Sequence, residues 1–177
     1  MVRLNFCPRC GGRLASGRPT PHEPERLVCA QCGRIHYLNS KVCGGVLLVR
    51  DGRALLAQRG VEPRRHYWDI PGGFLEPGEH PSEGAIREAR EELGVEVQLG
   101  PLLGMFMDTY ETTDGLEHTL SVYYLVECFS GEPRPDDDVE ALAWFTPEEV
   151  PAELAFPHLR RVIDAWRTPN LDPGRVR

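Results

Sequence analysis

The pattern of apolar and polar positions changes near residue 40. Before this point aliphatic side chains are sparse, and the chain is rich in Gly, Pro, Arg and Cys. After it, apolar runs of strand length alternate with turn signals, as in an ordinary α/β domain. We therefore expect a small module over residues 1–39, a larger domain over 40–168 and a flexible tail over 169–177.

The larger domain has the pattern of strands combined with helices. The runs "VCGGVLLVR" (42–50) and "RALLAQR" (53–59) flank a DG turn signal and predict a hairpin. Two longer strands are expected at about 95–109 and 117–128, and "DDDVEALAWF" leads from an acidic loop into a short strand. "TPEEV" predicts a helical turn, and a last helix is expected near 157–167. The fold class is α/β, with a mixed, mostly antiparallel sheet and helices packed on it.

A helix expected at about Ser82–Leu93 carries acidic residues that its packing does not explain. With about 100° per residue, one face is apolar and consists of Ile86, Ala89 and Leu93, with Ala85 at its margin. We expect Glu88, Glu91 and Glu92 together on the opposite side. Like charges at these spacings cost roughly 0.2–0.5 kcal/mol per pair, and acids near a helix C-terminus cost a further 0.3–1 kcal/mol or so. The pattern therefore indicates a cation beside these glutamates.

The sequence before this helix indicates which cation it is. "PGGF" supplies a Gly-rich loop whose backbone can approach a ligand closely, and Gly84 leaves space one turn before Glu88. Hard divalent cations take oxygen ligands, and Mg²⁺ usually bridges carboxylates to substrate phosphates. A solvated acidic face is the alternative interpretation. The context favours a carboxylate cluster for Mg²⁺ or Mn²⁺ that acts on a phosphorylated substrate.

Four cysteines of the N-terminal module predict a zinc site. They form two CxxC pairs, Cys7 with Cys10 and Cys29 with Cys32, in the pattern C-x2-C-x18-C-x2-C. Two such pairs can close a tetrahedral site around Zn²⁺, and a site filled by four protein ligands is structural. Metal binding would supply the folding free energy that the sparse core of this module lacks. A redox dithiol is the alternative, and the two histidines of the module are weaker candidate ligands.

Composition excludes several classes of function. The 177-residue chain has a formal net charge of −7 and no long basic run, which argues against general affinity for nucleic acid or anionic membranes. Apolar runs stay well below the roughly 20 residues of a membrane span, and "MVRLNFCPRC" lacks the apolar stretch of a signal peptide. A cytoplasmic location is expected. Cys43 and Cys128 lie in apolar, strand-like runs, where we expect small buried residues.

The acidic helix and its preceding loop resemble the Nudix box, G-x5-E-x7-R-E-U-x-E-E-x-G-U, in which U is apolar. Every fixed position is matched, by Gly73, Glu79, Arg87, Glu88, Ala89, Glu91, Glu92, Gly94 and Val95. The resemblance implies a Nudix α/β/α sandwich with a mixed sheet, preceded here by a small zinc ribbon. A ribbon in this position is similar to a subgroup that includes NADH and FAD pyrophosphatases.

The resemblance also implies a role for each acid of the box. Glu88 and Glu92 would be the main ligands of Mg²⁺ or Mn²⁺, Glu91 a further or water-mediated ligand, and the Gly73 carbonyl would complete the metal shell. The metal would neutralise the charge of a diphosphate and lower the pKa of the attacking water.

Arg87 would hold Glu79 and Glu91 in ion pairs, which the i,i+4 spacing of Arg87 and Glu91 makes physically reasonable.

Outside the box the expectations rest on weaker patterns. Relatives place a general base or extra ligand on a later loop, which here is "PDDDVE", with Glu140, Asp138 and Asp137 as candidates in that order. An ordinary solvated loop acid is the alternative for each. Candidate substrate contacts are Arg64, Arg65, Phe106 and Tyr110.

The resemblance implies hydrolysis of a nucleoside diphosphate linked to another moiety, such as ADP-ribose, FAD or NADH. The "SQPWPFP"-like array of typical NADH pyrophosphatases is absent, which favours ADP-ribose or FAD over NADH. Two alternatives remain, a housecleaning hydrolase of nucleoside triphosphates and a nucleotide-sensing regulator whose ribbon is an interaction module. Family members are commonly homodimers, so this state is also considered for the present chain.

Overall fold

The computed structural model describes residues 4–112 and 115–168, without the side chains of Tyr110 and Glu111. The tail expected over 169–177 lies outside this description. The described residues form two compact units: 4–40 together with 110–112 and 115–117 form the smaller one, and 41–109 together with 118–168 form the larger one.

The N-terminal unit contains a small antiparallel sheet with the order β1-β2-β3. Its strands are β1 (Leu14–Gly17), β2 (Arg26–Cys29) and β3 (Ile35–His36). Within the described part of residues 4–40, the buried apolar residues are Cys7 and Cys29, so this segment has almost no hydrophobic core of its own. A hydrophobic core therefore contributes little to the stability of this segment.

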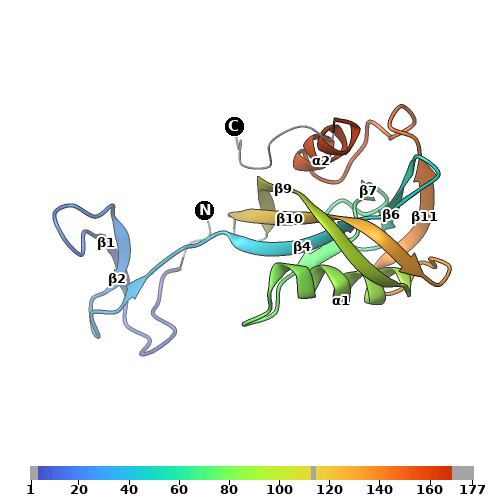
Figure 1. Cartoon of the computed structure of the whole chain (residues 1–177). Helices are drawn as coiled ribbons and strands as arrows, with labels where there is room; N and C mark the ends of the chain where they lie inside the picture. The colour runs from blue at the N-terminus through green and yellow to red at the C-terminus, as the bar shows by residue number, and fades with distance from the viewer. Residues whose placement is uncertain (1–3, 113–114, 169–177) are drawn as a thin grey trace. The chain divides into compact units, whose positions relative to one another are not determined.

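The larger unit contains two sheets, which Figure 1 shows between two helices. The first has the order β8-β4-β10-β9 and is mixed, because β4 runs parallel to β10 and antiparallel to β8. The second has the order β11-β6-β5, and β7 also pairs with β6. The bounds are β4 (Lys41–Leu47), β5 (Val49–Arg50), β6 (Arg53–Arg59), β7 (Trp68–Asp69), β8 (Gly72–Phe74), β9 (Glu96–Thr112), β10 (Gly115–Ser130) and β11 (Val139–Phe145).

The helices α1 (Pro81–Leu93) and α2 (His158–Arg167) cover opposite sides of these sheets (Figure 1). Alternate residues of one strand serve the two sides: Leu47 of β4 packs in the cluster with α2, whereas its neighbour Val46 packs in the cluster with α1. Strands covered on both faces are apolar at successive positions, which explains the continuous run "GGVLL". The α/β/α arrangement with a mixed sheet confirms the predicted fold class.

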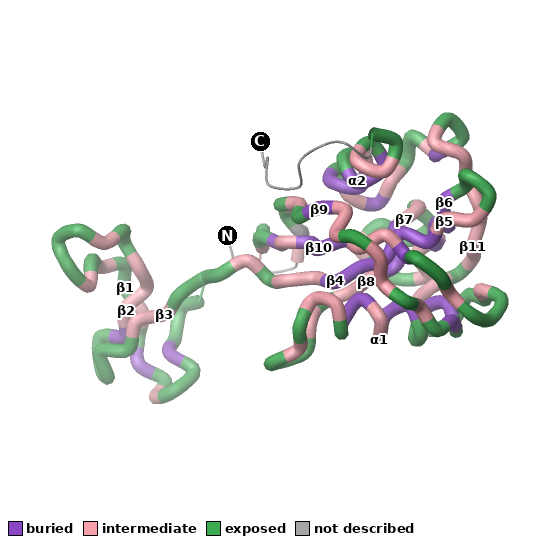
Figure 2. The backbone as a smooth tube through the Cα atoms, in the orientation of Figure 1, coloured by how far each residue is buried: buried purple, intermediate pink, exposed green. Residues whose placement is uncertain are grey.

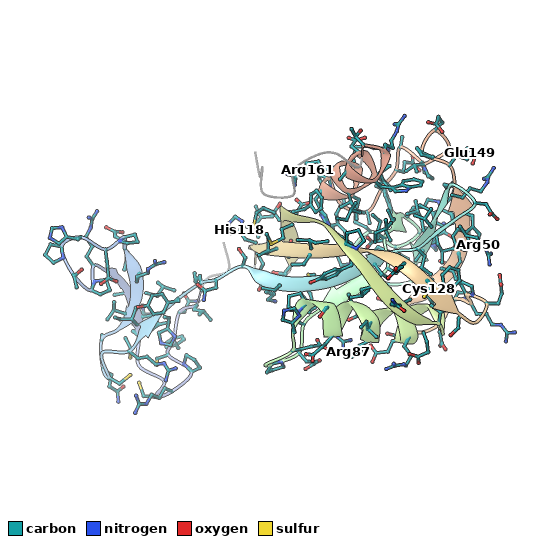
Figure 3. The ribbon with its side chains drawn as sticks, viewed as in Figure 1. Arg50, Arg87, His118, Cys128, Glu149 and Arg161 are labelled. Carbon is teal, nitrogen blue, oxygen red and sulfur yellow. The ribbon has the colours of Figure 1, made fainter. Side chains whose placement is uncertain are left out.

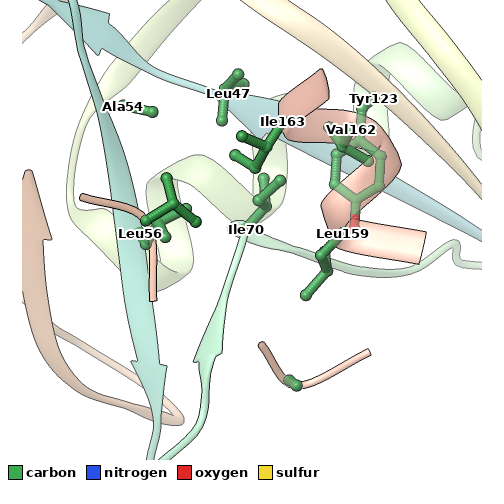
Figure 4. Close-up of a cluster of buried hydrophobic side chains, with 10 residues drawn as sticks. Leu47, Ala54, Leu56, Ile70, Tyr123, Leu159, Val162 and Ile163 are labelled. Atoms are coloured by element: carbon green, nitrogen blue, oxygen red, sulfur yellow. The ribbon is translucent and has the colours of Figure 1, made fainter. Parts of the chain in front are cut away.

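The cluster beneath α2 joins the two sheets. Leu47 and Leu56 come from different sheets, and both pack with Leu159 and Ile163 of the helix (Figure 4). All four side chains are fully buried. Figure 2 shows the same distribution, with buried residues concentrated in the strands and on the inner sides of the helices.

The start of α2 is held by a residue from another element. Pro157 precedes the helix and supplies no side-chain cap. Instead, Asp108 of β9 accepts a hydrogen bond from the backbone N–H of His158 at 2.9 Å, and its carboxylate lies 2.8 Å from His158 Nδ1. The other ring nitrogen lies 3.1 Å from the hydroxyl of Tyr123. This buried network joins α2 to the sheet beneath it.

Several predicted details differ from the structure. The strand expected over 42–50 is divided at Leu48, where the chain leaves the first sheet and enters the second. The short strands β7 and β8 were not predicted, because pairing rather than local pattern defines them. Cys128 is exposed on β10, so the prediction that it is buried is wrong. A turn at Thr146 is confirmed by the 3.2 Å hydrogen bond from Val150 N to its carbonyl.

Through the described parts of the chain, neither helix has the length and apolar character that crossing a membrane would require.

We expect Leu159→Ala to lower the free energy of unfolding by about 2–5 kcal/mol, because it opens a cavity in a fully buried cluster. Urea denaturation followed by circular dichroism measures this change. Met105→Ala, at an exposed position of β9, is the control and should change stability by less than about 0.5 kcal/mol. Equal effects of the two substitutions would contradict the assignment of this core.

Candidate active site

The ends of α1 are fixed by local sequence. His80 caps the N-terminus: its side chain accepts a hydrogen bond from Ser82 N, and its own N–H donates to the Glu83 carboxylate at 2.9 Å. Pro81 follows at the first helical position, where no N–H is needed. Gly94 ends the helix with φ of 65°, a left-handed conformation that favours glycine. These caps fix the helix register, and therefore the positions of its glutamates.

Two of these glutamates lie on the buried face of α1. Glu88 and Glu92 are each 8% exposed and lie on the same stripe as Ala85 and Ala89, at spacings of three and four residues. Glu91 is exposed on the outer side. The prediction that all three acids lie opposite the apolar face is therefore wrong for Glu88 and Glu92. They point toward the strands, so a solvated acidic face does not describe them.

The Gly-rich segment of β8 lies directly against these buried carboxylates. A Cβ atom at Gly73 would overlap the carboxylate of Glu88, so this strand approaches the helix only because the residue is glycine. The N–H of Gly72 donates to Glu92 Oε2 at 2.9 Å. The loop therefore lies at short range from both acids, whereas its composition predicted a close approach to a ligand.

Gly84 serves packing rather than ligand access. A Cβ atom there would overlap the side chain of Leu75, so the space expected near Glu88 is already filled by protein. Gly44 of β4 has a similar role, because a Cβ atom there would lie 2.5 Å from the carbonyl oxygen of Pro81. These two glycines let the first turns of α1 pack closely on the sheet.

Arg87, which lies on α1 (Figure 3), links three acids of the box into one network. Its guanidinium donates to both oxygens of Glu79, at 2.9 and 3.0 Å, and to the carbonyl of Phe74 at 3.0 Å. Its Nη1 also donates to Glu88 at 2.7 Å and to Glu91 at 2.8 Å. The contact with Glu88 was not expected from the sequence. Part of the positive charge that these acids require thus comes from the chain itself.

Glu92, unlike these acids, forms no ion pair with a described basic side chain. No Lys, Arg or His nitrogen of the described residues lies within 4.0 Å of its carboxylate, which accepts one hydrogen bond from a backbone N–H. Burial, followed by the negative charges of Asp69, Glu88 and Asp138, raises the pKa of Glu92 well above its ordinary value. Burial also raises the pKa of Glu88, although Arg87 opposes this shift. A divalent cation beside Glu92 would supply the charge that the protein does not.

A small pocket opens beside Glu92. Its lining residues come from β6, from β7 and the link to β8, from α1, and from the loop before β11 and the first residue of that strand. They are Ala57, Arg59, Asp69, Ile70, Pro71, Glu92, Asp138 and Val139. The loop is held at this place by backbone hydrogen bonds: Asp136 N donates to Glu92 O at 3.0 Å, and Gly60 N donates to Asp138 O at 2.7 Å. These contacts bring Asp138 to the same pocket as Glu92.

The other two candidate loop acids lie elsewhere. Glu140 is exposed, and its carboxylate lies 2.7 Å from Nδ1 of His66. Asp137 is also exposed and has φ of 51°. The structure therefore brings Asp138, the second candidate from the sequence, to the box, and directs Glu140 toward a histidine.

None of the predicted substrate contacts with a described side chain lines this pocket. Arg64 and Arg65 are exposed on the loop after β6. Phe106 packs against Tyr123, with ring centroids 6.2 Å apart, at the edge of the core beneath α2. The side chain of Tyr110 lies outside the described part of the structure.

The sequence analysis missed two charged residues of this pocket, Arg59 and Asp69. They form an ion pair at 3.0 Å, and both are largely buried. Asp69 stands immediately before "IPGG", so a charged residue within an apolar segment was the available signal. Arg59 ends an apolar strand and is indistinguishable in sequence from an exposed strand-end arginine.

The four cysteines of the N-terminal unit converge on one point. Their sulfur atoms all lie within 4.8 Å of one another, closer than the ligand atoms of any other group of three or more His, Cys, Asp or Glu in the described chain. The Cys7–Cys32 and Cys10–Cys29 sulfur distances are 3.8 and 3.5 Å, whereas a disulfide requires about 2.05 Å. Four convergent sulfur atoms at such spacing fit a tetrahedral metal site.

Both CxxC pairs have the same backbone geometry. The N–H of Gly11 donates to Cys7 O at 2.8 Å, and that of Gly33 donates to Cys29 O at 2.9 Å. Both glycines are left-handed, with φ of 73° and 70°. The N–H of Cys32 donates to Cys29 Sγ and lowers the pKa of this thiol to about 6. A thiolate, the form that binds metals, is thus favoured at Cys29 near neutral pH.

Comparisons with known proteins match both units. A family model described as "NUDIX domain" matches residues 40–166, and one described as "Nudix N-terminal" matches residues 5–38. The chain is similar to an ADP-ribose pyrophosphatase of Methanocaldococcus jannaschii, with 30% identity over 76% of this chain and 78% of that protein.

Two further similarities cover nearly the whole chain. An NAD-capped RNA hydrolase NudC of Pseudomonas aeruginosa is 32% identical over 91% of this chain, which spans about half of that relative (55%). Among solved structures, a NUDIX hydrolase from Nitrosomonas europaea aligns with a TM-score of 0.72 and 26% identity, over 93% of this chain and 89% of that one.

The raised pKa of Glu92 predicts a pH-dependent stability of the metal-free protein. Between the ordinary pKa of a glutamate and the higher pKa of Glu92, the folded state binds more protons than the unfolded state, so the free energy of unfolding falls as pH rises. We expect this loss to be smaller in Glu92→Gln, which should be more stable than the parent at pH 8 without metal. Thermal unfolding in a chelator between pH 5 and 8 measures the difference.

Glu96→Gln is the control for this experiment, because Glu96 is exposed and Arg90 lowers its pKa. If the parent and Glu92→Gln lost stability equally as pH rose, the account of Glu92 would be wrong.

Proposed function

Because the chain belongs to the Nudix hydrolase family, we propose that it hydrolyses the pyrophosphate bond of a nucleoside diphosphate linked to another moiety. The observation that carries this proposal is Glu92, a buried acid that lines a pocket, forms no ion pair with a described basic residue and lies one helical turn from Glu88, which Arg87 holds. Two relatives are described as acting on ADP-ribose and on NAD-capped RNA. Both of these compounds contain an adenosine diphosphate linked to a second ribose. ADP-ribose is therefore our first candidate, followed by FAD and NADH.

The residues present fit a Mg²⁺ or Mn²⁺ ion, which Nudix enzymes typically use in catalysis. Glu88 and Glu92 are the proposed main ligands, with Glu91 and the Gly73 carbonyl as further ones. The fit rests on two buried carboxylates whose pKa values are raised, since a cation would favour their ionised form. When bound, such an ion would offset the negative charge of a diphosphate and lower the pKa of a water molecule.

Arg87 and Glu79 are the proposed positioning pair. Glu79 accepts two hydrogen bonds from Arg87, which fixes the plane of the guanidinium. The same guanidinium then holds Glu88 and Glu91 at 2.7 and 2.8 Å. These acids are thereby oriented before a substrate arrives, and little reorganisation is required during the reaction.

Asp138 is the proposed general base. It lies in the pocket with Glu92, and its negative charge contributes to the raised pKa of that residue. A carboxylate at this position can accept the proton of an attacking water molecule. Glu140, the first candidate from the sequence, is already paired with His66 at 2.7 Å.

Product analysis tests the proposed reaction. With Mg²⁺ or Mn²⁺, we expect AMP and ribose 5-phosphate from ADP-ribose, and AMP and FMN from FAD. Pyrophosphate released from nucleoside triphosphates, with no cleavage of ADP-ribose or FAD, would favour a housecleaning hydrolase instead. Nucleotide binding without turnover of any of these compounds would favour a nucleotide sensor.

Glu92→Gln should lower kcat on the order of a hundred-fold or more while the fold is kept, because it removes charge but little volume. Glu96→Gln, on the exposed side of the same unit, should keep nearly full activity. Steady-state kinetics on the best substrate provide the measurement. Normal turnover by Glu92→Gln would show that the glutamates of α1 are not required for catalysis.

For the N-terminal unit, we propose that the four cysteines bind Zn²⁺. Elemental analysis after dialysis should give about one zinc per chain, and Cys29→Ser should lose it. Cys128→Ser is the matched control, since this cysteine is exposed and remote in sequence from the cluster. Folded protein without metal, in which all four thiols react freely, would exclude this site.

A further inference from the structure

Arg59, at the end of β6, is a largely buried cation in the acidic pocket. Its side chain is 17% exposed, and it is the one basic residue among those that line the pocket within the described chain. The same lining contributes three carboxylates, from Asp69, Glu92 and Asp138. Arg64 and Arg65, by contrast, are exposed on the loop that follows.

The guanidinium of Arg59 is held on three sides. Its Nε donates to the carbonyl of Pro63 at 2.9 Å, and its Nη1 donates to Asp69 Oδ2 at 3.0 Å. The ring of Phe156 lies 5.3 Å from the guanidinium carbon. Asp69 is itself fixed, because its other oxygen accepts the N–H of Ile70 at 2.8 Å. These contacts come from the loop after β6, from β7 and from the chain before α2, so the orientation of the cation is set by the fold.

The contacts leave one edge of the guanidinium unused. An arginine has five N–H donors, and the two hydrogen bonds engage Nε and one proton of Nη1. The Nη2 group of Arg59 donates to no atom of the residues that the structure describes. The Nη2 group is not among the buried unpaired polar atoms of the described residues, so it is accessible to water and to a ligand. A planar pair of N–H groups matches a phosphate oxygen edge.

Neutralising Asp69 alone would not explain this geometry. Burial disfavours the charged form of Asp69 and raises its pKa, and Arg59 opposes this shift. One N–H of Nη1 makes that contact, and the point charge of a lysine would oppose the shift as well. The unused Nη2 edge in a pocket shared with Glu92 indicates a ligand that the protein itself does not supply.

We propose that Arg59 binds a phosphoryl oxygen of the substrate through Nη2, with Asp69 and Phe156 as the residues that position it. This inference rests on the proposed function and adds a binding site for the diphosphate outside the Nudix box. The cation lies in the pocket of Glu92 and Asp138, so a diphosphate bound to it is placed beside the reacting groups.

Binding of α,β-methylene-ADP tests this site, because the methylene bridge prevents hydrolysis between the two phosphorus atoms. Arg59→Lys keeps a positive charge for Asp69 but loses the planar donor edge, and it should raise the Kd of this probe about tenfold or more. Isothermal titration in Mg²⁺ measures the Kd, and circular dichroism confirms that the variant is folded.

Arg53→Lys is the matched control. Arg53 stands at the other end of β6 and also binds one carboxylate, that of Glu149, and one backbone carbonyl, that of Trp144. Its Kd for the probe should stay within about twofold of the parent. If Arg59→Lys does not fold, the double variant Arg59→Gln/Asp69→Asn removes both buried charges together and should show the same weakened binding.

Three results would overturn the site: a Kd for Arg59→Lys within twofold of the parent, an equal loss in Arg53→Lys, or no binding of the probe by the parent. Product analysis on hydrolysable substrates is independent of this measurement. Cleavage of ADP-ribose together with an unchanged Kd in Arg59→Lys would leave the proposed reaction intact and remove Arg59 from it.

Discussion

The site depends on a buried carboxylate for which the protein provides no matching charge. Glu92 lies on the inner face of α1 and accepts a single backbone N–H, while Glu88, Asp69 and Asp138 add negative potential around it. Burying an unpaired acid is unfavourable, so the surrounding structure must hold it there. The caps of α1 fix the helix register, and the backbone of the loop before β11 binds the Glu92 carbonyl. A cation beside Glu92 would stabilise such a site, which agrees with the proposed metal binding.

The rest of the larger unit compensates for this local cost. Two apolar clusters, one beneath each helix, use alternate residues of the same central strands, so β4 and β6 are buried on both faces. Glycines at 44, 72 and 73 bring helix and strands close enough for backbone and carboxylates to meet. The unfavourable charges around Glu92 thus lie beside two well-packed apolar clusters. Proteins commonly keep such locally unfavourable groups at functional sites and compensate for them elsewhere in the fold.

Patterns local in sequence predicted much of this structure. The helix boundaries, the long strands and the four-cysteine cluster follow from caps, periodicity and spacing. The orientation of Glu88 and Glu92 was missed because charged residues were assigned to the outer face. Arg59 was not predicted, and Asp138 was ranked behind Glu140, because strand pairing and a backbone contact between Gly60 and Asp138 bring these residues to the pocket. Contacts between distant segments leave no periodic signal in one sequence.

The central proposal is that a divalent cation occupies the space between Glu88, Glu92 and a bound diphosphate. Crystals of the protein grown with Mn²⁺ and α,β-methylene-ADP allow the metal to be located by its anomalous scattering. We expect a strong peak within about 2.0–2.3 Å of carboxylate oxygens of both Glu88 and Glu92. A map with ordered water at these oxygens and no anomalous peak beside α1 would contradict the account.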